Sequence, residues 1–177
     1  MGTDHTGNLL GALSLVIADR TSDAVAGAAG RSDSAAAALS ALLHFLDRPT
    51  VDRLRQVLGL TSSGTVRLVD RLEAAGYVER AAGGDRRSTA IVLTPEGRAA
   101  AERVTAARGE VLDGALGALS AAEAEVLDEL LGKLLVGLIR GPGATRWMCR
   151  LCDMAACGHS EGRCPVRNET ARRYQAG

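Results

Sequence analysis

The sequence predicts a mainly α-helical fold with one small β-hairpin. Three observations predict it: apolar residues recur at helical spacing, capping residues separate the helical segments, and a Gly-Gly pair divides two short strand-like segments. The chain has 177 residues, enough for one domain and an extension. We therefore expect a domain over residues 1–140 and a segment of a different kind over residues 141–177.

Two helices are expected before residue 50. Ser32, Asp33 and Ser34 supply caps for the second, which we expect to end at Leu46. His44 in that helix is interpreted as a structural or surface histidine, because no further metal ligand lies at helical spacing from it. The first helix, over residues 8–28, has an apolar side formed by Leu9, Leu10, Leu13, Val16, Ile17 and Val25.

Two shorter helices joined by a tight turn are expected next. The first covers Val51–Leu58 and ends at Gly59, and the hydroxyl of Thr61 or Ser62 caps the second. Gly76 ends that second helix, where a left-handed residue is favoured. Helical spacing predicts one buried stripe on it, formed by Thr65, Leu68, Val69 and Leu72.

The hairpin is expected directly after these helices, with strands over residues 77–81 and 89–93. Gly83 and Gly84 would provide the positive φ of its tip. A helix-turn-helix followed by such a wing suits DNA binding. Between Arg53 and Arg87 there are seven arginines and four acidic residues, although the net charge of the whole chain is zero.

The residues predicted to contact DNA lie on the second of these helices and at the wing tip. Hydroxyls and arginines on a helix can meet phosphates and base edges in the major groove. Arginines at a loop tip suit the negative potential of a narrow minor groove. The alternative is two packed helices with a solvated charged face. The predicted contacts are Ser62, Ser63, Thr65, Val66, Arg67, Arg71, Asp85, Arg86 and Arg87.

The run LVDRLEAAGYVER…GDRRSTAIVLTPEGRA resembles the MarR family of dimeric winged-helix transcription regulators. Asp85-Arg86-Arg87 matches the family's wing signature, and residues 93–98 match the entry to its long dimerisation helix. The resemblance implies a homodimer, held by N- and C-terminal helices, that binds an inverted repeat in double-stranded DNA, usually as a repressor. Gly64 and Val66 replace the hydroxyl residues common in the family's recognition helix. Since Val66 can contact only a thymine methyl, the operator sequence is not predicted.

Two long helices are expected after the hairpin. Thr94 caps the first, Pro95 takes its first position, and it extends to about Gly117. Ser120 and Glu123 form a capping box that opens the last helix, Ala121–Arg140. Dimerisation would cover its wide apolar stripe, and an intrachain core is the alternative. The stripe comprises Val126, Leu127, Leu130, Leu131, Leu134, Leu135 and Leu138.

All four cysteines lie after residue 141, within sixteen residues: Cys149, Cys152, Cys157 and Cys164. Their spacing, C-x2-C-x4-C-x6-C, allows four thiolates to surround one metal. The segment is short and polar, so we expect ligation to supply its folding energy. His159 is a further candidate, as a ligand in place of one cysteine or as a hydrogen-bond donor behind one.

Four interpretations of this cysteine-rich segment remain open, and in the last of them its thiols have no role. A structural or sensory zinc site is typical of clustered cysteines with a nearby histidine in a reducing compartment. An iron–sulfur cluster also needs four cysteines. Without a metal, the thiols could act as a reversible disulfide switch.

The remaining features favour a regulator over other function classes. No Ser/His/Asp or paired-carboxylate arrangement stands out, so we expect no enzyme; a thiol- or metal-dependent enzyme and a protein-interaction adaptor are the alternatives. No apolar run reaches the 18 or so residues of a membrane span, and we expect a cytoplasmic protein. Peroxide-sensing members of the family use a cysteine near the N-terminus, and this chain has none before Cys149. A small-molecule effector stays open, since few aromatic residues are present to line a pocket for one.

Overall fold

A computed structural model describes residues 4–30, 32–84 and 88–174. Eight helices and one antiparallel hairpin occur in these residues. Their order along the chain is α1 (His5–Ala28), α2 (Asp33–His44), α3 (Val51–Leu58), α4 (Ser62–Ala74), β1 (Val78–Ala82), β2 (Thr89–Leu93), α5 (Pro95–Leu116), α6 (Ala121–Gly137), α7 (Ala144–Met148) and α8 (Pro165–Tyr174). The predicted class, mainly α with a β-hairpin wing, is confirmed.

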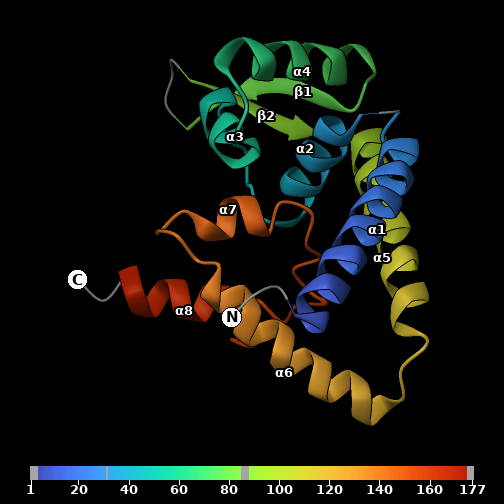
Figure 1. The fold of residues 1–177 in the computed structure, drawn as a ribbon. Coiled ribbons are helices and arrows are strands. Elements are labelled where there is room, and N and C mark those ends of the chain that lie inside the picture. Colours follow the sequence, from blue (N-terminus) through green and yellow to red (C-terminus); the bar gives the residue numbers. More distant parts are fainter. Residues whose placement is uncertain (1–3, 31, 85–87, 175–177) are drawn as a thin grey trace.

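The helices are arranged in two tiers (Figure 1). The upper tier holds α2, α3, α4 and the hairpin, in which Val78 pairs with Leu93 and Ala82 with Thr89. The long helices α1 and α5 pack side by side and descend from it, and α6 crosses the lower end. The last segment then returns toward the upper tier, where α7 packs against α3.

One main core joins the upper tier to the tops of α1 and α5. Leu39, Leu54, Leu68 and Ile91 are among its fully buried side chains. The predicted stripe on α4 is confirmed, because all four of its residues are at most 3% exposed. Burying these side chains is worth about 25 cal/mol per Å² of apolar surface, so this stripe fixes the orientation of α4.

The predicted helix ends are confirmed by their local geometry. Gly59 and Gly76 both have positive φ, and Thr61 accepts a hydrogen bond from the Gly64 amide. Thr94 caps α5, with Pro95 in its first turn, and Ser120 and Glu123 complete the capping box of α6. Other ends differ by a few residues: Asp4 caps α1, α2 ends at His44, and β1 covers Val78–Ala82.

The predicted role of the Gly-Gly pair at the wing is wrong. Neither Gly83 nor Gly84 has positive φ, because six residues separate the two strands and no two-residue turn is required. Gly83 is needed for close approach instead. Its amide donates to the Ser88 carbonyl at 2.8 Å, and a Cβ on Gly83 would lie 2.7 Å from that oxygen.

The apolar stripe of α6 is not covered within this chain. None of the residues of α6 is buried, so the interpretation of the stripe as an intrachain core is wrong. The lower half of α1 is likewise apolar and exposed. The exposed residues are Leu9, Leu10, Leu13, Leu15 and Val16 on α1, and Val126, Leu130, Leu131, Leu134, Leu135 and Leu138 on and just after α6.

The cysteine-rich segment packs against the rest of the chain. Leu151 contacts the main core, and a second small core unites Ile139, Ala144, Cys164 and Val166. Apolar burial therefore also contributes to the folding of this segment. None of the helices in the described ranges is both long enough and apolar enough to cross a bilayer.

Candidate nucleic-acid interface and metal centre

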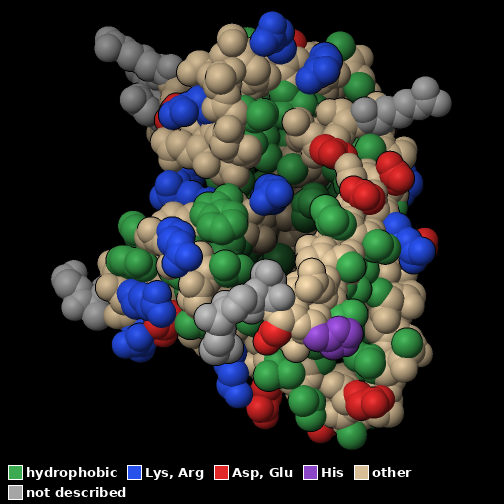
Figure 2. Space-filling view, viewed as in Figure 1, with side chains coloured by type: hydrophobic (Ala, Val, Ile, Leu, Met, Phe, Trp, Pro, Cys, Tyr) green, Lys and Arg blue, Asp and Glu red, His purple; other side chains and the backbone are tan. Residues whose placement is uncertain are grey.

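The outer face of α4 presents most of the predicted DNA contacts to solvent. Ser62, Ser63, Arg67 and Arg71 are exposed, and the apolar side chain of Val66 is 44% exposed. This side chain is unusually open for an apolar residue beside a core. Lys and Arg side chains lie over this end of the molecule, and others lie over the region of α7 and α8 (Figure 2). The outer face of α4 therefore presents hydroxyls, guanidinium groups and the methyl groups of Val66 to a binding partner.

Thr65 does not belong to this face. Its side chain is fully buried, and its hydroxyl donates to the Thr61 carbonyl at 3.0 Å. Thr65 belongs to the stripe that packs α4 on the core, and the two predictions made for it were incompatible. Its predicted DNA contact is therefore wrong.

Arg67 and Arg71 keep their charge available. Within the described residues neither forms an ion pair, whereas the nearby acidic residues of α4 do. Asp70 and Glu73 both bind the Arg80 guanidinium of β1, with 2.6 Å between Asp70 Oδ1 and Arg80 Nη2. The acidic groups that would neutralise the face are thus engaged by the wing.

Two arginines fix β1, the first strand of the wing, to neighbouring parts of the upper tier. Arg80 holds β1 against α4, and Arg48 Nη2 donates to the Ala82 carbonyl at 2.7 Å. Sequence analysis did not identify either arginine, although Asp70 and Glu73, three residues apart on one helix, signalled a site for a cation. The predicted wing-tip contacts Asp85, Arg86 and Arg87 lie outside the described residues.

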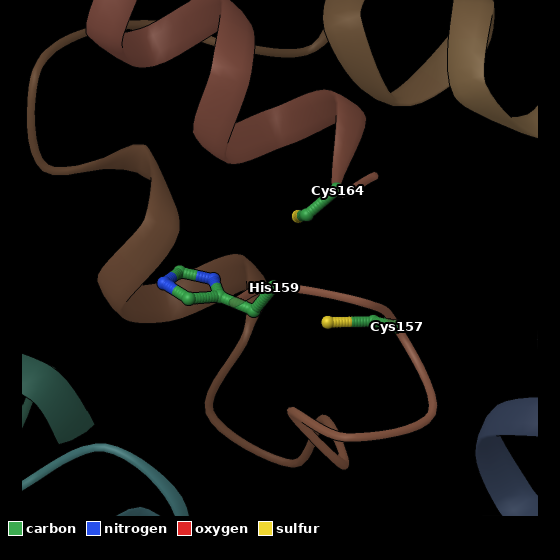
Figure 3. A group of neighbouring side chains, drawn as sticks. All are labelled: Cys157, His159 and Cys164. Atoms are coloured by element: carbon green, nitrogen blue, oxygen red, sulfur yellow. The ribbon is translucent and has the colours of Figure 1, made fainter. Parts of the chain in front are cut away.

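Three side chains of the last segment form a group with ligand chemistry (Figure 3). One ligand atom each from Cys157, His159 and Cys164 lies within 4.8 Å of the other two. Cys164 is 5% exposed, at the start of α8, while Cys157 and His159 come from the preceding loop. The predicted fourfold cysteine set therefore converges only in part, and His159 joins two of its members.

The other two cysteines form a neighbouring pair. A hydrogen bond between Cys149 and Cys152 raises the pKa of Cys149, and the same bond, aided by the Arg108 guanidinium, lowers the pKa of Cys152 to about 6. The negative charges of Cys157 and Cys164 also raise the pKa of Cys149. All four thiols therefore lie close enough to interact.

The electrostatics around this group favour a bound cation. Partial burial, then the charges of Cys164 and Cys152, raise the pKa of Cys157. Burial and the Arg167 guanidinium lower the pKa of His159, which keeps its imidazole neutral, as a metal ligand requires. Neighbouring thiolates repel one another, so several thiols can lose their protons together only when a positive charge lies beside them.

His44 is a structural histidine, as predicted. Its Nε2 lies 2.9 Å from Thr105 Oγ1, and that hydroxyl donates its only proton to the Ala101 carbonyl. Nε2 of His44 must therefore carry the hydrogen of this bond. Burial lowers the pKa of His44, opposed by the charge of Asp153 from the cysteine-rich segment.

The comparisons agree with this architecture. Residues 29–88, which include the helix-turn-helix and the start of the wing, match the sequence model of the MarR family. The crystal structure of the transcriptional regulator PA3341 is 28% identical, with a TM-score of 0.57 over 76% of this chain and 98% of its own. The helix-turn-helix region of the chain is therefore similar in sequence to the MarR family. PA3341 is a transcriptional regulator.

Two further MarR-type structures align over a similar span. Escherichia coli MarR in its apo form is 25% identical, with a TM-score of 0.55 over 71% of this chain and 96% of its own. A point mutant of Staphylococcus aureus MepR, bound to an oligodeoxyribonucleotide, is 22% identical, with a TM-score of 0.58 over 77% of this chain and 99% of its own. No curated protein sequence matches the chain. The alignments therefore cover almost all of each of these structures, but about a quarter of this chain has no counterpart in them.

Proposed function

We propose that the protein is a homodimeric repressor that binds a pseudo-palindromic operator through α4 and the wing. One observation carries the proposal: the exposed face of α4 has free arginines and hydroxyls, while its acidic side chains are bound by Arg80. In the MepR structure the bound partner is an oligodeoxyribonucleotide, which supports the same mode here. The proposal places the protein in the cytoplasm with its DNA.

In this mode α4 enters the major groove. Arg67 and Arg71 meet phosphates or guanine edges, Ser62 and Ser63 at the helix N-terminus meet phosphates, and Val66 contacts a thymine methyl. The wing tip, Asp85 to Arg87, follows the backbone into the minor groove, where arginines are favoured. These assignments rest on exposure for α4 and on the resemblance to the family for the wing tip.

The homodimer covers the apolar surfaces of α1 and α6. Exposed leucines on both helices would form one continuous patch, and such patches mark interaction sites in soluble proteins. A twofold dimer presents two copies of α4, and these match half-sites about 34 Å apart, one helical turn of DNA. The pseudo-palindrome follows from that symmetry.

The cysteine-rich segment over residues 141–177 is the proposed input domain, added to a DNA-binding and dimerisation domain over residues 1–140. The compact Cys157, His159 and Cys164 group supports metal binding, with zinc as the ion and with Cys149 and Cys152 as the other predicted ligands. An iron–sulfur cluster and a disulfide switch are the alternatives. Metal analysis distinguishes them from a zinc site, because a cluster contains iron and a disulfide switch contains no metal.

Selection from a pool of randomised DNA duplexes tests the DNA-binding mode. The full chain should enrich inverted repeats whose half-site centres lie about one helical turn apart. An Arg67→Ala/Arg71→Ala variant should enrich none, whereas Arg103→Ala, which removes an exposed arginine from α5, should behave as the wild type. Failure of the wild type to enrich any sequence would favour the adaptor interpretation.

A further inference from the structure

The cysteine-rich segment forms one wall of a cavity whose other wall belongs to the helix-turn-helix. The cavity has a volume of about 360 Å³. On one side lie Phe45 and Leu46, which follow α2, and Arg53 and Val57 of α3. The opposite side includes Cys149, Met154 and His159. A histidine of the candidate metal group therefore faces the first helix of the DNA-binding motif.

The spacing of the metal group suits a single ion. A zinc ion about 2.3 Å from each sulfur of a tetrahedral site keeps neighbouring sulfurs about 3.8 Å apart. The ligand atoms of Cys157, His159 and Cys164, all within 4.8 Å, need only small shifts to reach that geometry. In a [4Fe–4S] cluster each cysteine binds a different iron, so the sulfurs stand farther apart. Two thiolates and an imidazole also match zinc chemistry.

A tetrahedral ion needs a fourth ligand, and Cys149 is the better placed of the remaining two cysteines. Cys149 lines the same cavity as His159. Cys152 is not among the residues that line this cavity. The hydrogen bond between the two cysteines leaves Cys152 as a neighbour of the ligand sulfur.

We propose that one zinc-class ion bound by Cys149, Cys157, His159 and Cys164 fastens the cysteine-rich segment onto α3, so that metal occupancy controls the position of the helix-turn-helix. The metal site stands on its own geometry, and only its effect on DNA rests on the proposed function. Sequence reasoning from the position of the segment after α6 would instead send the signal through the dimerisation helices. The cavity and the packing of α7 point to α3.

The route from the ion to α4 consists of packed elements. Cys149 is the C-cap of α7, and α7 packs on α3. Arg146 of α7 donates to Gln56 Oε1 of α3 at 3.5 Å, and the next residue, Val57, is 1% exposed in the main core. Helix α3 packs in turn on α4. A shift of α7 therefore moves α3, and through the buried side chains that α3 shares with α4 in the main core it moves α4.

Cobalt titration of the metal-free full chain, prepared without oxygen, tests the ligand set. We expect one Co²⁺ per chain, with d–d bands of a tetrahedral site and sulfur-to-cobalt absorption for three thiolates. Zn²⁺ should displace it. Wild-type spectra that indicate four thiolates, or purified protein that contains iron and sulfide, would overturn the assignment. This readout needs no variant and is independent of DNA.

Matched variants then distinguish the contributions of Cys149, Cys152 and His159 to metal affinity. Cys149→Ser and His159→Ala should each weaken metal affinity by about 100-fold or more, whereas Cys152→Ser should weaken it by less than about tenfold. His5→Ala, at the start of α1, is the control for loss of a histidine. If Cys149→Ser and Cys152→Ser lost metal affinity equally and His159→Ala lost none, the ligands would be the four cysteines and the assignment would be wrong.

Hydrogen exchange of the full chain with and without Zn²⁺ tests the coupling. Zinc should slow amide exchange by about tenfold in residues 144–167 and also in α3, with a smaller change in α6, on which α8 packs. Protection confined to residues 144–167 would refute the route through α3 and leave the metal site standing. If zinc protects α3 but the protein selects no DNA sequence, the coupling stands and the proposed function fails.

Discussion

Arg80 Nη2 on β1 donates a hydrogen bond to Asp70 Oδ1 on α4 at 2.6 Å, and the same guanidinium binds Glu73. The first strand of the wing is thereby tied to the helix that presents Arg67 and Arg71. Both elements of the proposed DNA interface therefore move as one unit, with α4 anchored on the core and β1 anchored on α4. Such preorganisation reduces the ordering cost of binding.

Loss of the ion pairs of Arg80 should affect DNA affinity more than the stability of the fold. The pair is partly exposed, with side-chain exposures of 32% for Arg80 and 54% for Asp70, so we expect Arg80→Gln to change the free energy of unfolding by only about 0.2–1 kcal/mol. DNA affinity should fall by about tenfold, because the freed acidic groups then oppose phosphate binding. Urea denaturation and fluorescence anisotropy measure the two effects. Arg55→Gln removes the Asp52 pair as a control, and an equal loss there would contradict this role.

Gly97 should tolerate no side chain. A Cβ at this position would overlap the carbonyl oxygen of Tyr77, where the start of α5 passes the wing. We expect Gly97→Ala to destabilise the fold by about 1–3 kcal/mol through overpacking. Gly114→Ala, on the same helix with no neighbouring atom within 4 Å, should be neutral or stabilising by about 0.5–1 kcal/mol. Urea midpoints of the two variants check the contrast, and equal midpoints would show that the close approach is not rigid.

Charge placed on the apolar stripe of α6 should dissociate the dimer. Leu130→Asp/Leu134→Asp introduces two carboxylates into an exposed apolar surface that the proposed dimer would cover. We expect sedimentation of the variant as a monomer and a loss of at least about 100-fold in operator affinity, since one half-site alone remains. Glu129→Gln, on the polar side, is the control. Wild-type protein that sediments as a monomer would contradict the proposed dimer.

The burial of His44 predicts that the folded protein is less stable in mild acid. Burial lowers the pKa of His44 in the folded state below its unfolded value near 6.5, so the unfolded state binds the proton more readily. The stabilisation by neutral His44 is present above about pH 6.5 and is lost as the pH falls below it. His44→Asn should therefore destabilise the protein more at pH 7.5 than at pH 5.5. A difference of the opposite sign, in urea denaturation at both pH values, would show that the Asp153 charge outweighs burial.

Local signals account for what the sequence predicted well. The bounds of α3 and the buried stripe of α4 follow from capping residues and helical periodicity, which depend only on near neighbours. Gly83 was misinterpreted because a glycine pair suggests a two-residue turn, while the real requirement is closeness to Ser88 across the hairpin. His159 facing α3 results from packing between distant parts of the chain, which no local pattern encodes. Thr65 shows that one position cannot be in both the core and the DNA contact.

The central claim is that the exposed face of α4 binds DNA phosphates, and the salt dependence of binding tests it most directly. Fluorescence anisotropy of the full chain with a selected duplex should give an affinity that falls steeply with salt, with a log–log slope near −0.9 for each phosphate neutralised. Arg67→Ala/Arg71→Ala should reduce the magnitude of that slope by about 2, and Arg103→Ala should leave it unchanged. An identical slope for the double variant and the wild type would show that DNA binding does not occur through this face.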